Sequence, residues 1–303
     1  MNEKLMSMTE AVARFVKDGE ILVIEGFTHL ICFAAAHEII RQKKKNLTAC
    51  RLTPDLIYDQ LVAAGCVKKL VFSWAGNPGV GSLFGLRRAV EEGLPRPVAV
   101  EEYTHFGMVA RFMAGASHLP FMHLQTFAGS DLPRKNRKIK FINCPYTKKK
   151  LATVPALNPD LAVIHVQRAD SFGNAQIWGL MGVQREAAFA SAKVIIVAEE
   201  LVETSLIRRD PNRTLIPGMI VDAVVIEPFA CHPSYALGYY GRDNEFYVQW
   251  ARISKEKQSL DRYLTEWVYG LPGRKAYVEK LGPDYINRLK ADDRPSGSVN
   301  YGY

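Results

Sequence analysis

Short apolar runs alternate with amphipathic segments along the first half of the chain. Apolar positions at helical spacing predict helices, and short β-branched runs bounded by glycine or proline predict strands. The predicted strands are 20–24, 47–52, 69–73 and 99–102, and the predicted helices are 8–16, 33–41, 54–63, 82–92 and 108–116. Because strands and helices take turns, this half predicts βαβ units and a largely parallel sheet.

The second half resumes the alternation after one unusual segment. Residues 133–150 hold PRKNRKIK and KKK without an apolar helical face, which predicts a basic surface excursion or a strand pair. Strands are predicted at 161–166, 194–198 and 221–226, with a helix at 187–192 and a helical C-terminal region over about 246–290. We expect a single α/β domain over 1–303, an open, largely parallel sheet flanked by helices, with ligands at the carboxyl ends of its strands.

The composition is that of a globular protein and excludes several classes. Of the 303 residues, 48% are hydrophobic and 23% charged, which excludes a disordered chain, a fibrous repeat and a disulfide-bonded miniature. The apolar runs, such as 194–198 and 221–226, are far shorter than the roughly 20 residues of a membrane span. The start of the chain has no apolar signal core. We therefore expect a cytoplasmic protein that does not enter a membrane.

The net charge raises the question of an acidic partner. Lysine and arginine number 39 against 31 acidic residues, so the formal net charge is +8. Such a balance first suggests nucleic acid or a phosphate-bearing ligand. The excess lies largely in 41–45, 134–138 and 148–150, however, without interleaved aromatic residues or a nucleic-acid-binding motif. We interpret it mainly as solvated surface and expect no nucleic-acid partner.

Familiar cofactor and catalytic motifs are missing from the sequence. It has no dinucleotide, P-loop, zinc-protease or esterase signature, and its five cysteines are scattered without CxxC spacing. We therefore expect no bound cofactor and no metal. Residues 76–81 form either a loop that brings backbone N–H groups to a phosphate or a tight turn, and Asp222 is either a buried carboxylate or a cap. His105 lies between a strand end and a helix start, where side chains point into a cleft.

Several short segments occur together in the order and spacing of one enzyme family. They are 26–28, 38–42, 119–121, 129–130, 163–165, 177–179, 199–200, 207–211, 216–219, 221–225 and 232–234. Over about 5–290 the chain resembles the A (alpha) subunit of family I CoA-transferases, most of all the glutaconate CoA-transferase type. The resemblance implies an α/β fold shared with sugar-phosphate isomerases.

The resemblance also implies the reaction and the partner. The chain would be the alpha subunit of a two-subunit enzyme that moves CoA between an acyl-CoA and a short-chain or dicarboxylic acid, with coenzyme A as a substrate. A glutamate of the beta subunit would be the nucleophile. The expected assembly is a heterotetramer of two alpha and two beta subunits. An acidic beta subunit, or the phosphates of CoA, would then be partners for part of the positive charge.

The same resemblance assigns candidate site residues. His105 falls where many members carry a glutamine that holds the thioester oxyanion, and a histidine Nε2–H can do the same or act as an acid or base. The candidate substrate-binding residues are Gly26, Phe27, Thr28, His29, Ser73, Asn77, Gly129 and Ser130. For the loop that holds Gly129 and Ser130, an ordinary turn stays the alternative.

The sequence departs from the family pattern at the first loop as well. Glu25 stands where a glycine is usual, the expected proline is absent, and His29 and Cys32 line the loop instead. We interpret this as altered acceptor specificity. Some relatives of this family decarboxylate an acyl-CoA, and others open a ring of an acyl-CoA by hydration and carry a glutamate at the position of His105. A lyase or hydrolase of the same fold, decarboxylating or hydrating an acyl-CoA, is therefore the alternative function.

Overall fold

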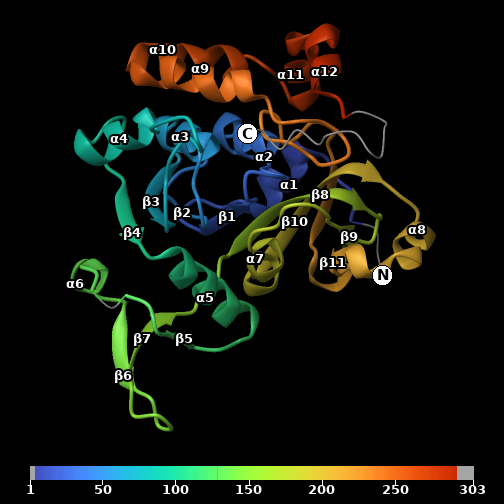
Figure 1. The fold of residues 1–303 in the computed structure, drawn as a ribbon. Helices are drawn as coiled ribbons and strands as arrows, with labels where there is room; N and C mark the ends of the chain where they lie inside the picture. Colours follow the sequence, from blue (N-terminus) through green and yellow to red (C-terminus); the bar gives the residue numbers. More distant parts are fainter. Residues whose placement is uncertain (1–3, 128, 292–303) are drawn as a thin grey trace.

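A nine-stranded, mostly parallel sheet forms the centre of the molecule (Figure 1). The computed structural model describes residues 4–127 and 129–291. The parallel strands follow the spatial order β4–β3–β2–β1–β8–β10–β12. They are β1 (Ile21–Glu25), β2 (Leu47–Cys50), β3 (Val67–Phe72), β4 (Ala99–Glu102), β8 (Leu161–Ala169), β10 (Lys193–Leu201) and β12 (Ala223–Ile226). Two short antiparallel strands, β9 (Ala175–Gln176) and β11 (Thr214–Ile216), extend the sheet beside β8.

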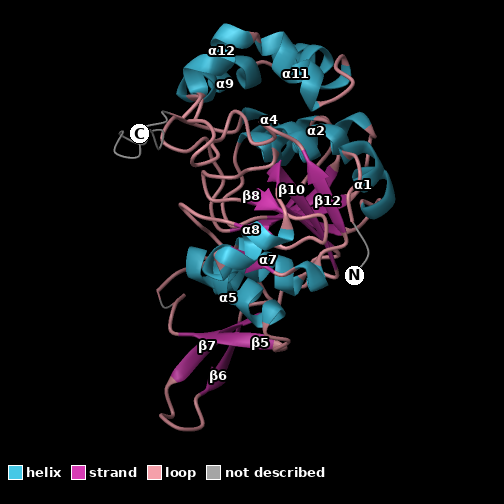
Figure 2. Cartoon of the chain, turned by 90° about the vertical axis from the view of Figure 1, so that its right-hand side faces the viewer, coloured by secondary structure: helices cyan, strands magenta, loops and turns pink. Residues whose placement is uncertain are grey.

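Helices cover both faces of the sheet, and a C-terminal layer lies over one of them (Figures 1 and 2). The helices on the faces and edges are α1 (Met8–Phe15), α2 (Phe33–Arg41), α3 (Leu56–Ala63), α4 (Phe84–Glu91), α5 (His105–Ala116), α7 (Gln184–Ala190) and α8 (Thr204–Arg209). The C-terminal layer consists of α9 (Asn244–Lys255), α10 (Lys257–Tyr263), the π-helical turn η3 (Leu264–Tyr269), α11 (Arg274–Leu281) and α12 (Pro283–Leu289). Single 3-10 turns occur at η1 (Pro211–Arg213) and η2 (Gly218–Ile220).

Side chains along each strand point alternately to the two faces of the sheet, and this alternation divides the core into two clusters. In β1, Leu22 and Ile24 pack on the side of α1–α3, and Val23 packs on the side of α5 and α7. Successive side chains of a strand point to opposite faces, so a strand covered on both faces must be apolar throughout. The central strand β8 has this character, with eight of its nine residues buried. The apolar runs of the sequence are therefore central strands.

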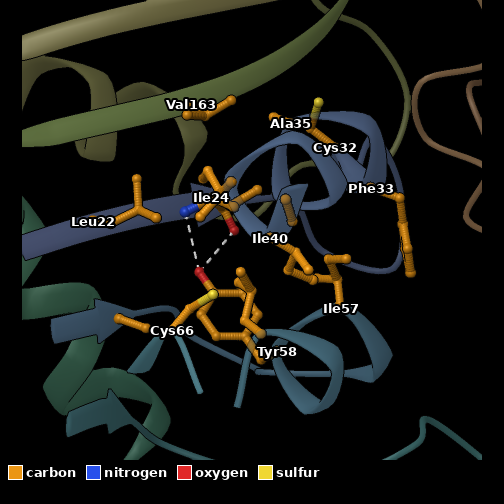
Figure 3. Close-up of a cluster of buried hydrophobic side chains, with 14 of the residues drawn as sticks. Leu22, Ile24, Cys32, Phe33, Ala35, Ile40, Ile57, Tyr58, Cys66 and Val163 are labelled. Atoms are coloured by element: carbon orange, nitrogen blue, oxygen red, sulfur yellow. Dashed lines mark hydrogen bonds between the residues drawn. The ribbon is translucent and has the colours of Figure 1, made fainter. Parts of the chain in front are cut away.

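Tyr58 marks the place where β1 and β2 separate. Figure 3 shows its hydroxyl beside the backbone of Ile24, where it accepts from the N–H at 3.1 Å. The same hydroxyl lies 2.9 Å from the carbonyl oxygen of Cys50 and 3.2 Å from that of Ile24, and it donates to these acceptors. The β1–β2 ladder pairs Val23 with Cys50 at its last position. Tyr58 therefore bonds to the backbone of both strands at the point where their pairing ends.

A smaller antiparallel sheet projects from the body (Figure 2). Its order is β5 (Phe121–Leu124), β7 (Lys150–Pro155) and β6 (Lys140–Asn143). The short helix α6 (Leu132–Lys135) lies between β5 and β6 in the chain. The predicted basic excursion at 133–150 is therefore part of a strand pair. Its charge is not all solvated, since Lys138 Nζ lies 2.9 Å from the buried Glu101 carboxylate.

Most predicted elements are found within a few residues of their expected bounds. Helix α5 begins three residues earlier than the predicted 108, because Thr104 caps it by accepting from Gly107 N at 3.0 Å. Asp222 lies outside β12, is half-buried, and accepts from Val194 N at 3.0 Å and from Lys193 Nζ at 3.0 Å, so it holds the start of β10 and not a neighbouring helix or loop. In the described part of the chain no helix combines the length and apolar character that crossing a membrane requires.

Candidate active site

His105, Ser73 and Phe27 come together from the ends of three strands. His105 is the first residue of α5, directly after β4, Ser73 follows β3, and Phe27 follows β1. Ser73 Oγ lies 3.1 Å from His105 Nδ1. The Phe27 and His105 rings are perpendicular, with 6.5 Å between their centroids and 89° between their planes. His105 is exposed, so its other ring nitrogen is open to a ligand or to another protein.

The turn after β1 is closely packed and depends on glycine. A Cβ on Gly26 would lie 2.7 Å from the carbonyl oxygens of His29 and Leu30, which no side chain permits. Thr28 and Leu30 both have φ of 56°, a left-handed conformation that L-residues rarely adopt. Arg51 Nη2 donates to the Gly26 carbonyl oxygen at 2.5 Å. The loop is therefore rigidly held, and it fixes Phe27 against His105.

His29 and Thr28 hold the loop to the rest of the molecule. His29 is fully buried, its Nδ1 donates to the carbonyl oxygen of Leu180 at 2.8 Å, and its Nε2 accepts from Leu237 N at 3.0 Å. Burial lowers the pKa of His29 to about 4, so the ring is neutral. The Thr28 carbonyl oxygen accepts from Ser234 Oγ at 2.8 Å. Both ring nitrogens of His29 are thus engaged in protein contacts.

Glu25 is a buried carboxyl group at the carboxyl end of β1. Its side chain has no exposed surface, and Leu52 N donates to Oε2 at 3.4 Å. Oε1 has no hydrogen-bond partner among the described residues. Burial raises the pKa of Glu25 to about 7, although the positive charge of Arg51 opposes the shift. Sequence reasoning noted Glu25 only as a departure from the family pattern.

Arg51 and Asp55 form an ion pair beneath the loop, which sequence reasoning missed. Arg51 Nη1 lies 2.9 Å from Asp55 Oδ1, and each side chain is 1% exposed. Asp55 also caps α3 by accepting from Ile57 N. The available signal was an arginine near the carboxyl end of the predicted strand 47–52, where a long cation can reach the neighbouring strand end. Arg51 of this pair thus brings a positive charge close to Gly26 and Glu25.

Asn77 lies elsewhere, under the C-terminal layer. It is 1% exposed, its Nδ2 donates to the carbonyl oxygen of Tyr247 in α9 at 2.7 Å, and its backbone N–H donates to Gly81. The glycine-containing loop at 76–81 is therefore a tight turn tied to α9. No contact in the described part of the chain joins Asn77 to His105.

Gly129 and Ser130 lie on a loop that reaches α5 through Phe127. A Cβ on Gly107 in the first turn of α5 would lie 2.8 Å from Cζ of Phe127. Gly129 has φ of 76° with open space around its Cα, and Ser130 is exposed. Ser130 N donates to the Phe127 carbonyl oxygen at 3.3 Å. The loop thus has the geometry of a turn and lies close to the first turn of α5.

One group of buried side chains has the composition of a metal site. Ligand atoms of His165, Glu199 and Cys231 lie within 4.8 Å of one another. Glu199 already accepts from His165 Nε2 at 2.8 Å, from the Tyr240 hydroxyl at 2.5 Å and from Phe229 N at 2.8 Å. Burial raises the pKa of the Cys231 thiol well above its usual range, which disfavours the thiolate that a metal needs. These contacts describe a hydrogen-bonded polar cluster in the core.

Comparison with known proteins identifies a family whose sequence model matches this chain. The coenzyme A transferase family matches residues 5–227. The A subunit of the 3-oxoadipate CoA-transferase of Pseudomonas knackmussii is 49% identical over 278 residues, which are 92% of this chain and 98% of that protein. The A subunit of the glutaconate CoA-transferase of Acidaminococcus fermentans is 32% identical, over 95% of this chain and 94% of that protein.

Two solved structures share the fold. The crystal structure of the Acidaminococcus fermentans glutaconate CoA-transferase matches with a TM-score of 0.91 and covers 96% of each chain. The structure of the decarboxylase AibA/AibB matches with a TM-score of 0.72 at 30% identity, over 86% of this chain and 98% of that chain.

Proposed function

The chain belongs to the coenzyme A transferase family, and we propose that it works with a separate B subunit to move CoA between an acyl-CoA and a dicarboxylic acid. The resemblance inferred from the sequence is confirmed. Both relatives above 30% identity whose activity is named are A subunits of CoA-transferases, and their named acids, 3-oxoadipate and glutaconate, are dicarboxylic. Because 3-oxoadipate belongs to the relative with 49% identity, it is the first acid to test.

The observation that carries the proposal is the exposed His105 beside Ser73 and Phe27. An imidazole at the start of α5 can hold the carbonyl oxygen of a thioester through a hydrogen bond or charge. Phe27 and Ser73 would border the acyl group, and Gly129 and Ser130 would approach its carboxylate. Gly26, Thr28 and His29 would shape the site by holding its first loop, whereas Asn77 would hold the turn at 76–81 against α9. The whole chain, 1–303, would act as one domain.

The nucleophile would come from the partner protein. Glu25 is the glutamate adjacent to the Gly26–Phe27 turn, but it has no exposed surface and cannot reach a thioester. A glutamate of the B subunit would attack the acyl-CoA, release the CoA thiolate and form a mixed anhydride. The CoA thiolate would then attack the glutamate carbonyl of the anhydride, which releases the donor acid and leaves a thioester between CoA and the glutamate. The acceptor carboxylate would attack this thioester to form a second anhydride and release the thiolate, which would attack the acceptor's acyl carbonyl, form the new acyl-CoA and free the glutamate. Two A and two B subunits would make up the complete enzyme, with coenzyme A as its substrate.

A decarboxylase or hydrolase is the second candidate function. The AibA/AibB match and the acid–base capacity of His105 favour it. The identity of 49% to the A subunit of a transferase outweighs these observations, because the decarboxylase is only 30% identical.

The test is a thioester-exchange assay on the chain co-purified with its B subunit, which we expect to be encoded by a neighbouring gene. We expect CoA transfer from succinyl-CoA or acetyl-CoA to 3-oxoadipate or glutaconate by the complex and none by the chain alone. In the complex, His105→Ala should lower kcat/KM by at least about tenfold. Activity of the isolated chain, or release of carbon dioxide or a hydrated product without transfer, would refute the proposal.

A further inference from the structure

The hydroxyl of Ser73 contacts two groups at once. Ser73 Oγ lies 2.5 Å from the carbonyl oxygen of Leu52 and 3.1 Å from Nδ1 of His105. Two oxygens at the shorter distance require a hydrogen between them. A carbonyl oxygen has none to offer, so the hydroxyl hydrogen of Ser73 is donated to Leu52. Ser73 Oγ then faces His105 with a lone pair only.

This arrangement determines which nitrogen of His105 carries the hydrogen. Since Ser73 Oγ can only accept, Nδ1 of His105 must be the donor. In neutral imidazole the other nitrogen, Nε2, then has a lone pair and no hydrogen. We propose that Ser73 is a positioning residue that holds neutral His105 in the Nδ1–H tautomer, so that the exposed Nε2 offers a lone pair to a proton or to a hydrogen-bond donor.

The surrounding structure keeps this geometry in place. The Leu52 carbonyl oxygen also accepts from Ser73 N at 3.2 Å, and Leu52 N donates to the buried Glu25. The cap made by Thr104 fixes the backbone at the start of α5, and the Phe27 ring lies perpendicular to the imidazole ring. The acceptor on Ser73 is therefore presented from a rigid strand end. The bond pattern can change only if Ser73 loses its contact with Leu52.

The tautomer changes what His105 can do in the transferase proposed above, on which this inference rests. Neutral His105 cannot donate from Nε2 to a thioester oxyanion, although it can accept a proton or a hydrogen bond there. Donation requires the imidazolium, which adds a full positive charge beside the oxyanion. His105 is thus not a simple replacement for a glutamine, whose amide donates without charge.

Spectroscopy tests the tautomer without any assay of activity. We expect nitrogen-15 NMR of the labelled A–B complex at alkaline pH to show His105 protonated on Nδ1, with His105→Gln identifying its resonance. In Ser73→Ala the signal should shift toward the Nε2–H form, and in Ser73→Thr, which keeps a hydroxyl, it should stay. An Nε2–H signal in the wild type, or no change in Ser73→Ala, would overturn the inference.

Kinetics test whether Ser73 acts through His105. We expect Ser73→Ala to lower kcat by about 10- to 100-fold with KM within about threefold, and Ser73→Thr to restore most of the loss. In the His105→Gln background, Ser73→Ala should change kcat by less than about threefold, because the group that it positions is gone. Equal losses in both backgrounds would contradict a positioning role. Absence of CoA transfer in the wild type would refute only the proposed function, since the tautomer is read independently.

Discussion

Glu25 shows how the fold changes the chemistry of one residue. A carboxyl group with no exposed surface at the end of β1 loses its hydration, and burial raises its pKa to about 7. In the unfolded chain the same group titrates near its ordinary value of 4.5. Between pH 4.5 and about pH 7 the folded protein keeps a proton on Glu25 that the unfolded chain has lost. Its contribution to stability is therefore fully present below about pH 4.5 and is lost as pH rises toward 7.

Glu25→Gln should reveal the cost of burying the ionised Glu25 carboxylate. The free energies of unfolding of the variant and the wild type should differ by an amount that depends on pH. Near pH 4.5 the variant and the wild type should have similar free energies of unfolding. By about pH 8 the variant should be more stable by up to about 3 kcal/mol, because its neutral amide avoids the cost of burying a charge. Urea unfolding of both proteins across this range measures the difference. A difference that does not change with pH would show that Glu25 is not buried in its neutral form.

At the scale of elements, α5 carries His105 and is positioned at its other end by Gly115. A Cβ on Gly115 would lie 2.2 Å from the Leu157 carbonyl oxygen and 2.9 Å from Cβ of Ala190 in α7. Backbone atoms cannot move aside as a side chain can, so α5 lies this close to its neighbours only because residue 115 is glycine. The helix thus links the core on this face to the position of the imidazole.

Gly115→Ala is expected to lower the free energy of unfolding by about 1 to 3 kcal/mol, because α5 must shift to relieve the overlap. The shift should also lower the kcat of the A–B complex by displacing His105. Gly81→Ala is the matched control, since a Cβ there meets nothing within 4 Å, and it should leave both quantities almost unchanged. Equal effects of the two substitutions in chemical unfolding would contradict the packing argument.

At the scale of the whole molecule, the C-terminal layer is tied to the sheet by buried polar contacts. Trp250 of α9 donates from Nε1 to Asp59 Oδ2 of α3 at 3.0 Å, and Leu86 N of α4 donates to the other carboxylate oxygen at 2.6 Å. Arg88 Nη1 donates to the Ser254 and Lys255 carbonyl oxygens. Asp59 and Trp250, 191 positions apart in the sequence, thus fix the layer that also holds Asn77 and its loop.

Trp250→Phe should lower the free energy of unfolding by about 2 to 3 kcal/mol, since it removes a buried hydrogen bond and leaves an Asp59 oxygen without a donor. A double-mutant cycle with Asp59→Asn isolates this contact from the loss of volume. In the Asp59→Asn background Trp250→Phe should cost at least about 1 kcal/mol less. Full additivity of the two substitutions in denaturant melts would show that the bond contributes nothing.

The sequence by itself determined the architecture and the family. Apolar periodicity is a local property, so runs such as 161–166 and 194–198 located central strands without knowledge of their neighbours. Short strands were missed, among them β9 and β11, because two or three residues carry no measurable period. Segments matching in order and spacing identified the CoA-transferase family, which the relatives confirm.

Only the tertiary structure decided which candidate residues meet. Ser73 and His105, 32 positions apart, come together because β3 and β4 are neighbours in the sheet, whereas Asn77 bonds to Tyr247, 170 positions away. His29 has the residue type of a ligand, yet burial and two hydrogen bonds make it a loop anchor. Burial and hydrogen-bond partners depend on packing between distant segments. That is why the sequence could place His105 and Glu25 at strand ends but could not assign a tautomer to one or a raised pKa to the other.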